Sequence, residues 1–218
     1  MDDKLLIASR VAQELRPGTL VNLGIGLPTL VAGLVKPDSH IFFQSENGIV
    51  GMQSIPEHGL EDDDLTDAGG RPISALPGAA TFDSAMSFGL IRGGHLDVTV
   101  LGGLQVDRNG RLANWMVPGK MVPGMGGAMD LVTGARRVIV AMTHTAKGEH
   151  KIVHELNLPL TSTRCVDLVV TEMAVLRPTP EGMVLQEIAP GVTVEQVRAA
   201  TGTLLIVGEH VPVMGGAG

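Results

Sequence analysis

Short apolar runs separated by turn residues dominate the first part of the chain. In residues 3–15 apolar side chains recur every three or four positions, which predicts an opening helix with Asp3 as its N-cap. Residues 19–22 and 40–44 are rich in β-formers, which predicts two short strands. A helix is predicted over residues 28–35 between them. The chain therefore begins as strands that alternate with helices.

The rest of the chain repeats this alternation and then changes to consecutive strands. The pattern predicts further helices at residues 81–92, 128–132 and 194–200. It predicts further strands at residues 97–101, 104–106, 112–115, 137–142, 166–171, 174–177 and 183–188. Asn109-Gly110 is a hairpin signal, and Thr193 with Gln196 forms a capping box for the last helix.

These elements predict an α/β fold with a single domain over residues 1–208. Strands that alternate with helices form an open, mostly parallel sheet with helices on both faces, and the later strands add an antiparallel β-rich portion. Residues 209–218 end in Gly-Gly-Ala-Gly and are predicted to be a flexible tail. Ligands bind such sheets at the carboxyl ends of the strands, so a site is expected in the loops there.

Composition is that of a soluble globular protein. Hydrophobic residues make up 44 % of the 218 residues and charged residues 18 %. No apolar stretch reaches the roughly 20 residues that a membrane-spanning helix needs, so no membrane partner is expected. Residues 1–4 are acidic and lack the basic start of a signal peptide. The expected location is the cytoplasm.

Charge and aromatic content argue against a nucleic-acid partner. The net charge is −7, aromatic residues make up 2 % and Tyr is absent, whereas nucleic-acid surfaces combine basic stripes with stacking rings. The overall field would not attract an anionic substrate, so local groups must hold one. Cys165 has no second cysteine to pair with, and the apolar run that follows it predicts a small buried side chain.

Two patterns suggest a metal site, and neither is complete. The acidic run at residues 61–64 lacks the ligand spacing and the glycine of a calcium-binding loop. His150 and His154 are four residues apart, but the glutamate of the H-E-x-x-H zinc motif is missing between them. No metal is expected.

Gly24 and Gly26 form a turn between a predicted strand and a predicted helix. They begin a G-x-G-x-x-G dinucleotide pattern, but its third glycine position holds Thr29. Two interpretations remain open for this turn. It is either a tight structural connection or an anion-binding turn at the start of the following helix.

A lone carboxylate, Glu46, follows the predicted strand at residues 40–44. It would therefore lie where an α/β sheet binds its ligand. Most Glu side chains simply lie on the surface. At its ordinary pKa of about 4.3, however, a glutamate is ionised at neutral pH and needs no general base to act as a nucleophile. Glu46 is the candidate catalytic residue.

The segment Gln44-Ser45-Glu46-Asn47-Gly48 resembles the active-site segment of the family I CoA-transferases, in particular the B subunit of the 3-oxoacid CoA-transferases. Other segments resemble landmarks of that family in the same order, over roughly residues 5 to 207. They are Asn22 to Pro28, Leu76 to Ala79, Ile91 to His95, Leu112 to Trp115 and Gly126 to Leu131. The resemblance implies the α/β fold that CoA-transferases share with some sugar-phosphate isomerases.

In that family the matching glutamate attacks an acyl-CoA thioester. The resemblance therefore implies a ping-pong reaction through a glutamyl-CoA thioester on Glu46, with CoA as a substrate and no other cofactor. It implies that the backbone at Gly126 and Gly127 comes close to the reacting group. Of the two, the Gly127 amide is the better candidate to donate a hydrogen bond to the oxyanion. It also implies a substrate loop that contains Gly24, Gly26, Asn47 and Gly48.

The resemblance also implies substrates and a partner. The segment from Trp115 to Gly127 is more similar to the succinyl-CoA:acetoacetate enzymes of ketone-body metabolism than to the 3-oxoadipate enzymes. Succinyl-CoA and acetoacetate are therefore expected, with 3-oxoadipate as the alternative acid. The match covers only the B half of the family, which implies a separate A half as the partner, in an A2B2 assembly.

Two other classes of function stay open at this stage. A sugar-phosphate isomerase can use a related fold with a carboxylate base, but it needs a Lys- or Arg-lined phosphate site, which no segment of the sequence provides. A non-catalytic ligand-sensing module is the other. Transfer of labelled CoA between two acids separates both from a CoA-transferase.

Overall fold

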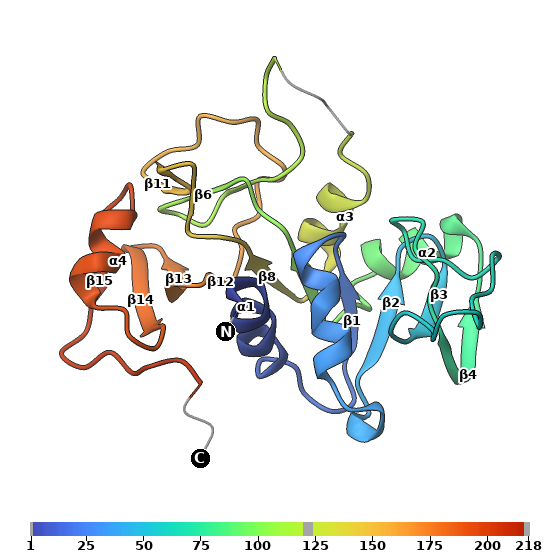
Figure 1. The fold of residues 1–218 in the computed structure, drawn as a ribbon. Coiled ribbons are helices and arrows are strands. Elements are labelled where there is room, and N and C mark those ends of the chain that lie inside the picture. The colour runs from blue at the N-terminus through green and yellow to red at the C-terminus, as the bar shows by residue number, and fades with distance from the viewer. Residues whose placement is uncertain (1, 120–123, 216–218) are drawn as a thin grey trace.

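The computed structural model describes residues 2–119 and 124–215 and is built around one ten-stranded sheet (Figure 1). The strands lie in the order β15-β14-β13-β12-β8-β5-β1-β2-β3-β4. Their bounds are β1 Leu20–Leu23, β2 Phe42–Ser45, β3 Ile49–Met52, β4 Ala75–Thr81, β5 Val98–Leu101, β8 Arg137–Ala141, β12 Leu168–Val170, β13 Ala174–Thr179, β14 Gly182–Ile188 and β15 Leu205–Val207.

The centre of the sheet is parallel and its flanks are antiparallel. Strands β2, β1, β5, β8 and β12 all run in one direction. Strands β3 and β4 continue the sheet antiparallel on one side, and β13 and β14 do so on the other, where β15 then pairs parallel to β14. This arrangement confirms the predicted α/β fold with an antiparallel portion.

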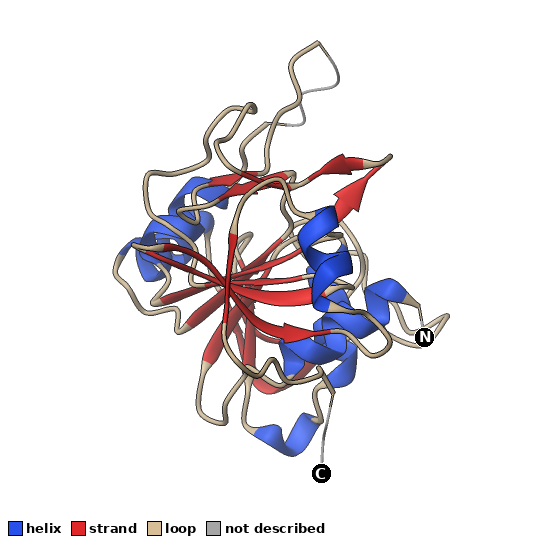
Figure 2. Cartoon of the chain, turned by 90° about the vertical axis from the view of Figure 1, so that its left-hand side faces the viewer, coloured by secondary structure: helices blue, strands red, loops and turns tan. Residues whose placement is uncertain are grey.

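Helices cover both faces of the sheet, as the end-on view of Figure 2 shows. Their bounds are α1 Asp3–Ala12, α2 Ser84–Arg92, α3 Ala128–Gly134 and α4 Val194–Ala200, with 3-10 helices η1 Leu27–Leu34 and η2 Pro37–Ser39. Helix α1 packs on η1 and on β8, whereas α2 packs on α3. The central strands therefore lie between two helical layers.

Alternating side chains of the central strands build the two cores. In β8, Ile139 and Ala141 belong to the core under α1 and η1, whereas Val138 and Val140 belong to the core under α2 and α3. Because successive side chains of a strand point to opposite faces, a strand buried on both faces must be apolar at every position. This explains the continuous apolar runs in the sequence.

A smaller β-region lies beside the main sheet, near the carboxyl ends of its parallel strands (Figure 1). It contains the three-stranded sheet β11-β6-β7 and the hairpin β9-β10. The bounds are β6 Gln105–Asp107, β7 Leu112–Ala113, β9 Thr145–Ala146, β10 Glu149–His150 and β11 Ile152–Val153. The predicted turn at Gly110 has φ +85°, and a Cβ there would lie 2.8 Å from Pro178, so glycine suits both the turn and the packing.

Several local predictions differ from the structure. The N-cap of α1 is Asp2, not Asp3, because Asp2 has the extended backbone of a cap and accepts the Lys4 amide at 3.3 Å. The helix predicted at residues 28–35 is the 3-10 helix η1. Cys165 is exposed rather than buried, because β12 begins only at Leu168.

Part of the predicted flexible tail is anchored to β14. The Ile188 amide donates to the Pro212 carbonyl at 3.0 Å, and the Met214 amide donates to the Ile188 carbonyl at 2.7 Å. The Met214 side chain is buried in the core under α1. Residues 212–214 therefore belong to the folded domain, while residues 216–218 lie outside the described residues. Within the described part of the chain, no helix is long and apolar enough to cross a membrane.

Candidate active site

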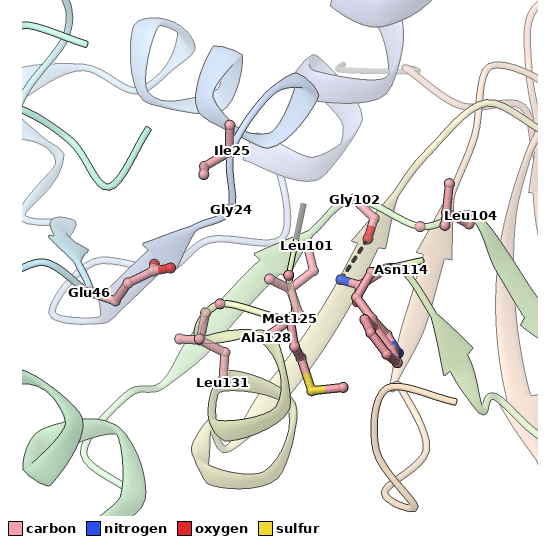
Figure 3. A pocket seen from close by; sticks show the side chains of 15 residues that line it. Gly24, Ile25, Glu46, Leu101, Gly102, Leu104, Asn114, Met125, Ala128 and Leu131 are labelled. Atoms are coloured by element: carbon pink, nitrogen blue, oxygen red, sulfur yellow. Dashed lines mark hydrogen bonds between the residues drawn. The ribbon is translucent and has the colours of Figure 1, made fainter. Parts of the chain in front are cut away.

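A cavity of about 510 Å³ lies at the carboxyl ends of β1, β2 and β5 (Figure 3). Its wall is made of glycines and apolar side chains, with Asn114 and Trp115 as further members. Glu46 is the single ionisable residue among the described residues that line it. The described lining residues are Gly24, Ile25, Glu46, Leu101, Gly102, Gly103, Leu104, Asn114, Trp115, Gly124, Met125, Gly126, Gly127, Ala128 and Leu131.

Glu46 is the first residue after β2 and lies in the tight turn that leads to β3. Gly48 makes this turn possible, because its φ of +128° is unfavourable for any residue with a side chain. A Cβ at Gly48 would also collide with the carbonyl oxygen of Phe82. The Gly48 amide donates to the Ser45 carbonyl at 3.0 Å, and the Gly48 carbonyl accepts from the Phe82 amide at 2.9 Å. The turn therefore holds Glu46 rigidly at the end of the strand.

Asn22 is the one side chain that donates a hydrogen bond to the Glu46 carboxylate among the described residues. Its Nδ2 lies 3.4 Å from Glu46 Oε2 and 2.8 Å from Gln44 Oε1. Asn22 is completely buried in β1, which lies next to β2. The donor thus comes from the neighbouring strand and approaches the carboxylate from the interior of the protein.

Burial raises the pKa of Glu46 above its ordinary value. The hydrogen bond from Asn22 opposes this shift, and the negative charge of Asp67 adds to it. Asp67 itself is held by Arg71, whose Nη2 lies 2.8 Å from Asp67 Oδ2. A carboxylate with a raised pKa is a stronger base, so the environment makes Glu46 a better nucleophile than an exposed glutamate.

The backbone of Gly127 comes close to the Glu46 carboxylate. A Cβ built on Gly127 would lie 3.2 Å from Glu46 Oε1 and 3.3 Å from Phe88 Cζ, so a larger residue would press on both. Gly126 has φ +53°, which favours glycine. Among the described residues, the amides of Gly126 and Gly127 have no hydrogen-bond acceptor.

Comparison with known proteins gives the family. The model of the coenzyme A transferase family matches residues 4–200. The chain belongs to the coenzyme A transferase family. It is 58 % identical to the beta subunit of the acetate CoA-transferase of Escherichia coli K12 over 202 residues, which cover 92 % of each chain. It is 50 % identical to the B subunit of the succinyl-CoA:3-ketoacid coenzyme A transferase of Helicobacter pylori 26695 over 196 residues, covering 89 % of this chain and 94 % of that protein.

The fold is also found in a solved structure from another Escherichia coli strain. The acyl-CoA transferase YdiF of strain O157:H7 superposes with a TM-score of 0.80 at 23 % identity. The match covers 98 % of this chain but only 43 % of the YdiF chain. This coenzyme A transferase chain therefore spans less than half of the length of that structural relative.

Four of the predicted site residues meet at the cavity of this coenzyme A transferase. They are Glu46, Gly24, Gly126 and Gly127. The other three do not line it. Asn47 is exposed and donates to the Thr66 carbonyl at 2.7 Å, Gly48 shapes the turn behind Glu46, and Gly26 precedes η1 with φ +91°.

The two metal patterns lie away from the cavity. Residues 61–64 belong to an exposed loop, and His150 and His154 are exposed on the smaller β-region. His150 Nδ1 contacts the Ala200 carbonyl at 2.7 Å. Across the described residues, no three metal-ligating side chains come together.

The prediction from sequence missed the polar residues behind Glu46. Asn22, Gln44 and Thr99 are each completely buried within short, mostly apolar strands. A polar residue in a buried strand must find a hydrogen-bond partner, and in β1 and β5 a single polar residue among apolar ones was a signal in the sequence. The sequence does not give the order of the strands, and it is this order that brings the three side chains together.

A second buried polar group that the sequence did not reveal is His144, three residues after the end of β8. It contacts the Thr171 and Thr201 hydroxyls, each at 2.9 Å, and burial lowers its pKa to about 4. It does not line the cavity around Glu46. A neutral imidazole between two hydroxyls is a structural element of the core.

Proposed function

We propose that the chain is the glutamate-bearing subunit of a CoA-transferase and that Glu46 is the nucleophile. One observation carries the proposal: the single ionisable residue among the described lining of the cavity is a partly buried carboxylate with no basic partner. A carboxylate that forms a structural ion pair would not be free to attack. Glu46 instead has an amide donor on one side and glycine backbone on the other.

The proposed reaction begins when Glu46 attacks the thioester carbon of an acyl-CoA. The carbon–sulfur bond breaks, CoA leaves as the thiolate, and an acyl-glutamyl anhydride forms. The thiolate then attacks Cδ of Glu46, the bond between Cδ and the bridging oxygen breaks, and the first acid leaves as its carboxylate. A second carboxylate reverses both steps and leaves as its CoA ester. No proton or electron has to be supplied from outside.

Backbone amides have a role in each step of this reaction. The carbonyl oxygen of the attacked group gains negative charge, and a hydrogen-bond donor placed at that oxygen lowers the barrier. We assign this role to the Gly127 amide, with Gly126 beside it, because Gly127 lies close to the carboxylate and neither amide has an acceptor among the described residues. The apolar side chains of Ile25, Leu101 and Leu131 would limit the water that can hydrolyse the intermediates.

Small carboxylic acids are the proposed second substrates. Acetoacetate, with succinyl-CoA as donor, is favoured by the sequence resemblance, and 3-oxoadipate is the alternative. Acetate is a further candidate, because the acetate CoA-transferase chain of Escherichia coli is more similar to this chain than the succinyl-CoA:3-ketoacid chain of Helicobacter pylori is. Specificity constants for acetate, acetoacetate and 3-oxoadipate with one CoA donor would rank the three acids.

A separate A subunit is the proposed partner, in an A2B2 assembly. Both relatives are named as one subunit of their enzymes, and this chain spans 43 % of YdiF. Ile25 lines the cavity yet is 62 % exposed, and Met129 on α3 is 50 % exposed. Apolar side chains exposed at a cavity, as Ile25 is, or beside a lining residue, as Met129 is beside Ala128, are suited to contact with a second, different chain. The purified chain should show negligible transfer until that partner is added.

The two alternative functions find less support at this cavity. A sugar-phosphate isomerase needs cations for the phosphate, and no Lys or Arg occurs among the described lining residues. A ligand-sensing module would have no use for an unpaired carboxylate with a raised pKa at its centre.

Trapping of the covalent intermediate tests the proposal. The assembled enzyme is incubated with acyl-CoA alone, quenched in acid and digested, and the peptide that contains Glu46 is weighed by mass spectrometry. We expect the mass of CoA on this peptide in the wild type and none in Glu46→Gln. If CoA is transferred to a second acid but no such adduct forms, a ping-pong reaction on Glu46 is contradicted.

A further inference from the structure

Three polar side chains form a row across the centre of the sheet. Thr99 on β5 pairs with Asn22 on β1, and Asn22 pairs with Gln44 on β2. Their neighbours in each strand belong to the core under α1, so all three point toward the layer of α2 and α3. All three are completely buried, as is Ser87 on α2, which ends the row.

The hydrogen bonds of this row have a direction. The Thr99 hydroxyl donates to Asn22 Oδ1 at 3.2 Å, which leaves the Asn22 Nδ2 group facing Gln44 and Glu46. At the other end, Gln44 Nε2 donates to Ser87 Oγ at 2.9 Å, which leaves Gln44 Oε1 to accept from Asn22. Asn22 Nδ2 also lies 3.3 Å from the Gln44 main-chain carbonyl, an acceptor that cannot change its role and so fixes which way the Asn22 amide is turned. The hydroxyls at the two ends hold the far side of each amide in that orientation.

The opposite orientation of Asn22 would be unfavourable. If the amide turned over, Asn22 Oδ1 would face Gln44 Oε1 and the Glu46 carboxylate, and three acceptors would meet without a donor. Burial makes such an unsatisfied arrangement costly, since no bulk water compensates for the missing hydrogen bonds. Without the Thr99 hydroxyl and the Ser87 oxygen, each amide loses the hydrogen bond that holds its far side, and the amides are less firmly held in this orientation.

We propose that Thr99 and Ser87 are positioning residues that lock the Asn22 and Gln44 amides so that Asn22 always presents an N–H group to Glu46. This inference rests on the proposed function, because it concerns the same carboxylate. Asn22 binds Oε2, whereas Oε1 is the oxygen nearest the Gly127 backbone. The lock therefore assigns Oε1 as the attacking oxygen and holds it toward the amides that would receive the substrate.

The pair of variants Thr99→Val and Thr99→Ser tests the lock. Valine keeps the shape of threonine but has no hydroxyl, whereas serine keeps the hydroxyl but loses the methyl group. Each variant is assembled with the A subunit, its fold is checked by circular dichroism, and two quantities are measured. These are the rate at which the Glu46 peptide gains CoA from acyl-CoA and the pH profile of kcat/KM.

We expect Thr99→Val to slow adduct formation about 3- to 10-fold, the range that the loss of one hydrogen bond predicts, with little change in KM for acyl-CoA. The acid limb of the kcat/KM profile should move to higher pH, because a less well-held Asn22 stabilises ionised Glu46 less. Asp67 is the charged group that also acts on Glu46, and it is unchanged in both variants. Thr99→Ser should retain the wild-type pH profile and a rate within about twofold of wild type.

Ser87→Ala is the second, independent variant. It removes the acceptor of Gln44 from the other end of the row and should shift the pH profile in the same direction. A wild-type profile and adduct rate in Thr99→Val or in Ser87→Ala, or an equal loss in Thr99→Ser and Thr99→Val, would overturn the lock. Full activity of Glu46→Gln would instead overturn the proposed function, so the two failures are distinguishable.

Discussion

Two partly buried glutamates of this chain have opposite surroundings. Glu14, just beyond α1, accepts from Arg10 at 2.7 Å and from Arg137 at 2.6 Å. Burial alone would raise its pKa, but the hydrogen bonds from Arg137 and Arg10 lower it below the ordinary value. Glu46 has no arginine or lysine partner among the described residues, and its pKa is raised. The same residue type thus forms structural ion pairs in one place and is the proposed nucleophile in the other.

The difference lies in what satisfies each carboxylate. Two guanidinium groups surround Glu14 and join α1 to β8, while Arg10 also binds Glu187 on β14 through two bonds of 2.6 and 2.7 Å. Glu46 has only the neutral Asn22 amide as a side-chain donor among the described residues. A charged partner stabilises the anion and reduces its tendency to attack. The donors at Glu46 are neutral, the Asn22 amide and the backbone amide of Glu46 itself, and they stabilise the anion less.

The largest expected effect comes from exchanging each carboxylate for an amide of equal size. Glu46→Gln should lower CoA transfer by about four orders of magnitude or more, because no anhydride can form. Glu14→Gln should keep wild-type turnover per folded enzyme but lose stability. Transfer assays and thermal unfolding of both variants, each assembled with the A subunit, check the pair. Substantial turnover by a folded Glu46→Gln would remove Glu46 from the mechanism.

Gly127→Ala should have the next largest effect. The added methyl group would lie 3.2 Å from Glu46 Oε1, while a backbone φ of −80° allows alanine, so the change acts on the carboxylate and not on the chain. We expect kcat to fall about 100-fold, which is comparable to the loss of one oxyanion donor. Gly33→Ala is the matched control, because its Cβ has nothing within 4 Å and the residue does not line the cavity. Equal kcat values in the two variants would contradict the close approach.

Arg10→Met should reduce stability rather than activity. The Arg10 guanidinium group contacts both Glu14 and Glu187, and the change removes both contacts. Arg10 is only 9 % exposed, so water does not replace them fully. Removing one partner of a buried ion pair costs about 3–5 kcal/mol, and the partial exposure of both glutamates reduces this to about 2 kcal/mol. Denaturant unfolding gives the free energy, and kcat of the folded fraction should stay within about twofold of wild type.

Much of the fold could be predicted from sequence, because its signals are local. The continuous apolar run of β8 and the capping box of Thr193 and Gln196 predicted their elements directly, and both are present. The position of Glu46 at the carboxyl end of β2 was predicted in the same way. The local chemistry of a strand end and its turn was sufficient for these features.

The rest of the site depends on contacts between distant segments. The row of Thr99, Asn22 and Gln44 exists because β5 and β2 lie on either side of β1. The sequence of a single strand does not predict which strands lie beside it. The raised pKa of Glu46 was missed for a similar reason, since the ordinary value was assumed and burial is a property of the folded chain. Cys165 was misplaced because the apolar run after it was taken to begin a strand earlier than β12 does.

The pH dependence of stability has opposite signs for the two glutamates. A carboxyl group whose pKa is raised on folding, as that of Glu46 is, binds its proton more tightly in the folded protein. Its contribution to stability therefore falls as the pH rises from the unfolded pKa through the folded one. The contribution of Glu14 is present above the unfolded pKa and is lost as the pH falls through the lowered folded pKa.

The smallest expected effect follows from these signs and compares the two glutamates directly. Glu46→Gln should unfold at the same or a slightly higher temperature than wild type at pH 7, and the difference should shrink toward pH 4, where the wild-type carboxyl group gains its proton. For Glu14→Gln the deficit in melting temperature should be largest at pH 7. It should also shrink as the pH falls below about 4, because the protonated wild type then loses the same ion pairs. Melting curves of the three proteins at several pH values supply the measurement. A clear loss of stability in Glu46→Gln at pH 7 would mean that ionised Glu46 stabilises the fold, as Glu14 does, and would contradict the contrast between the two sites.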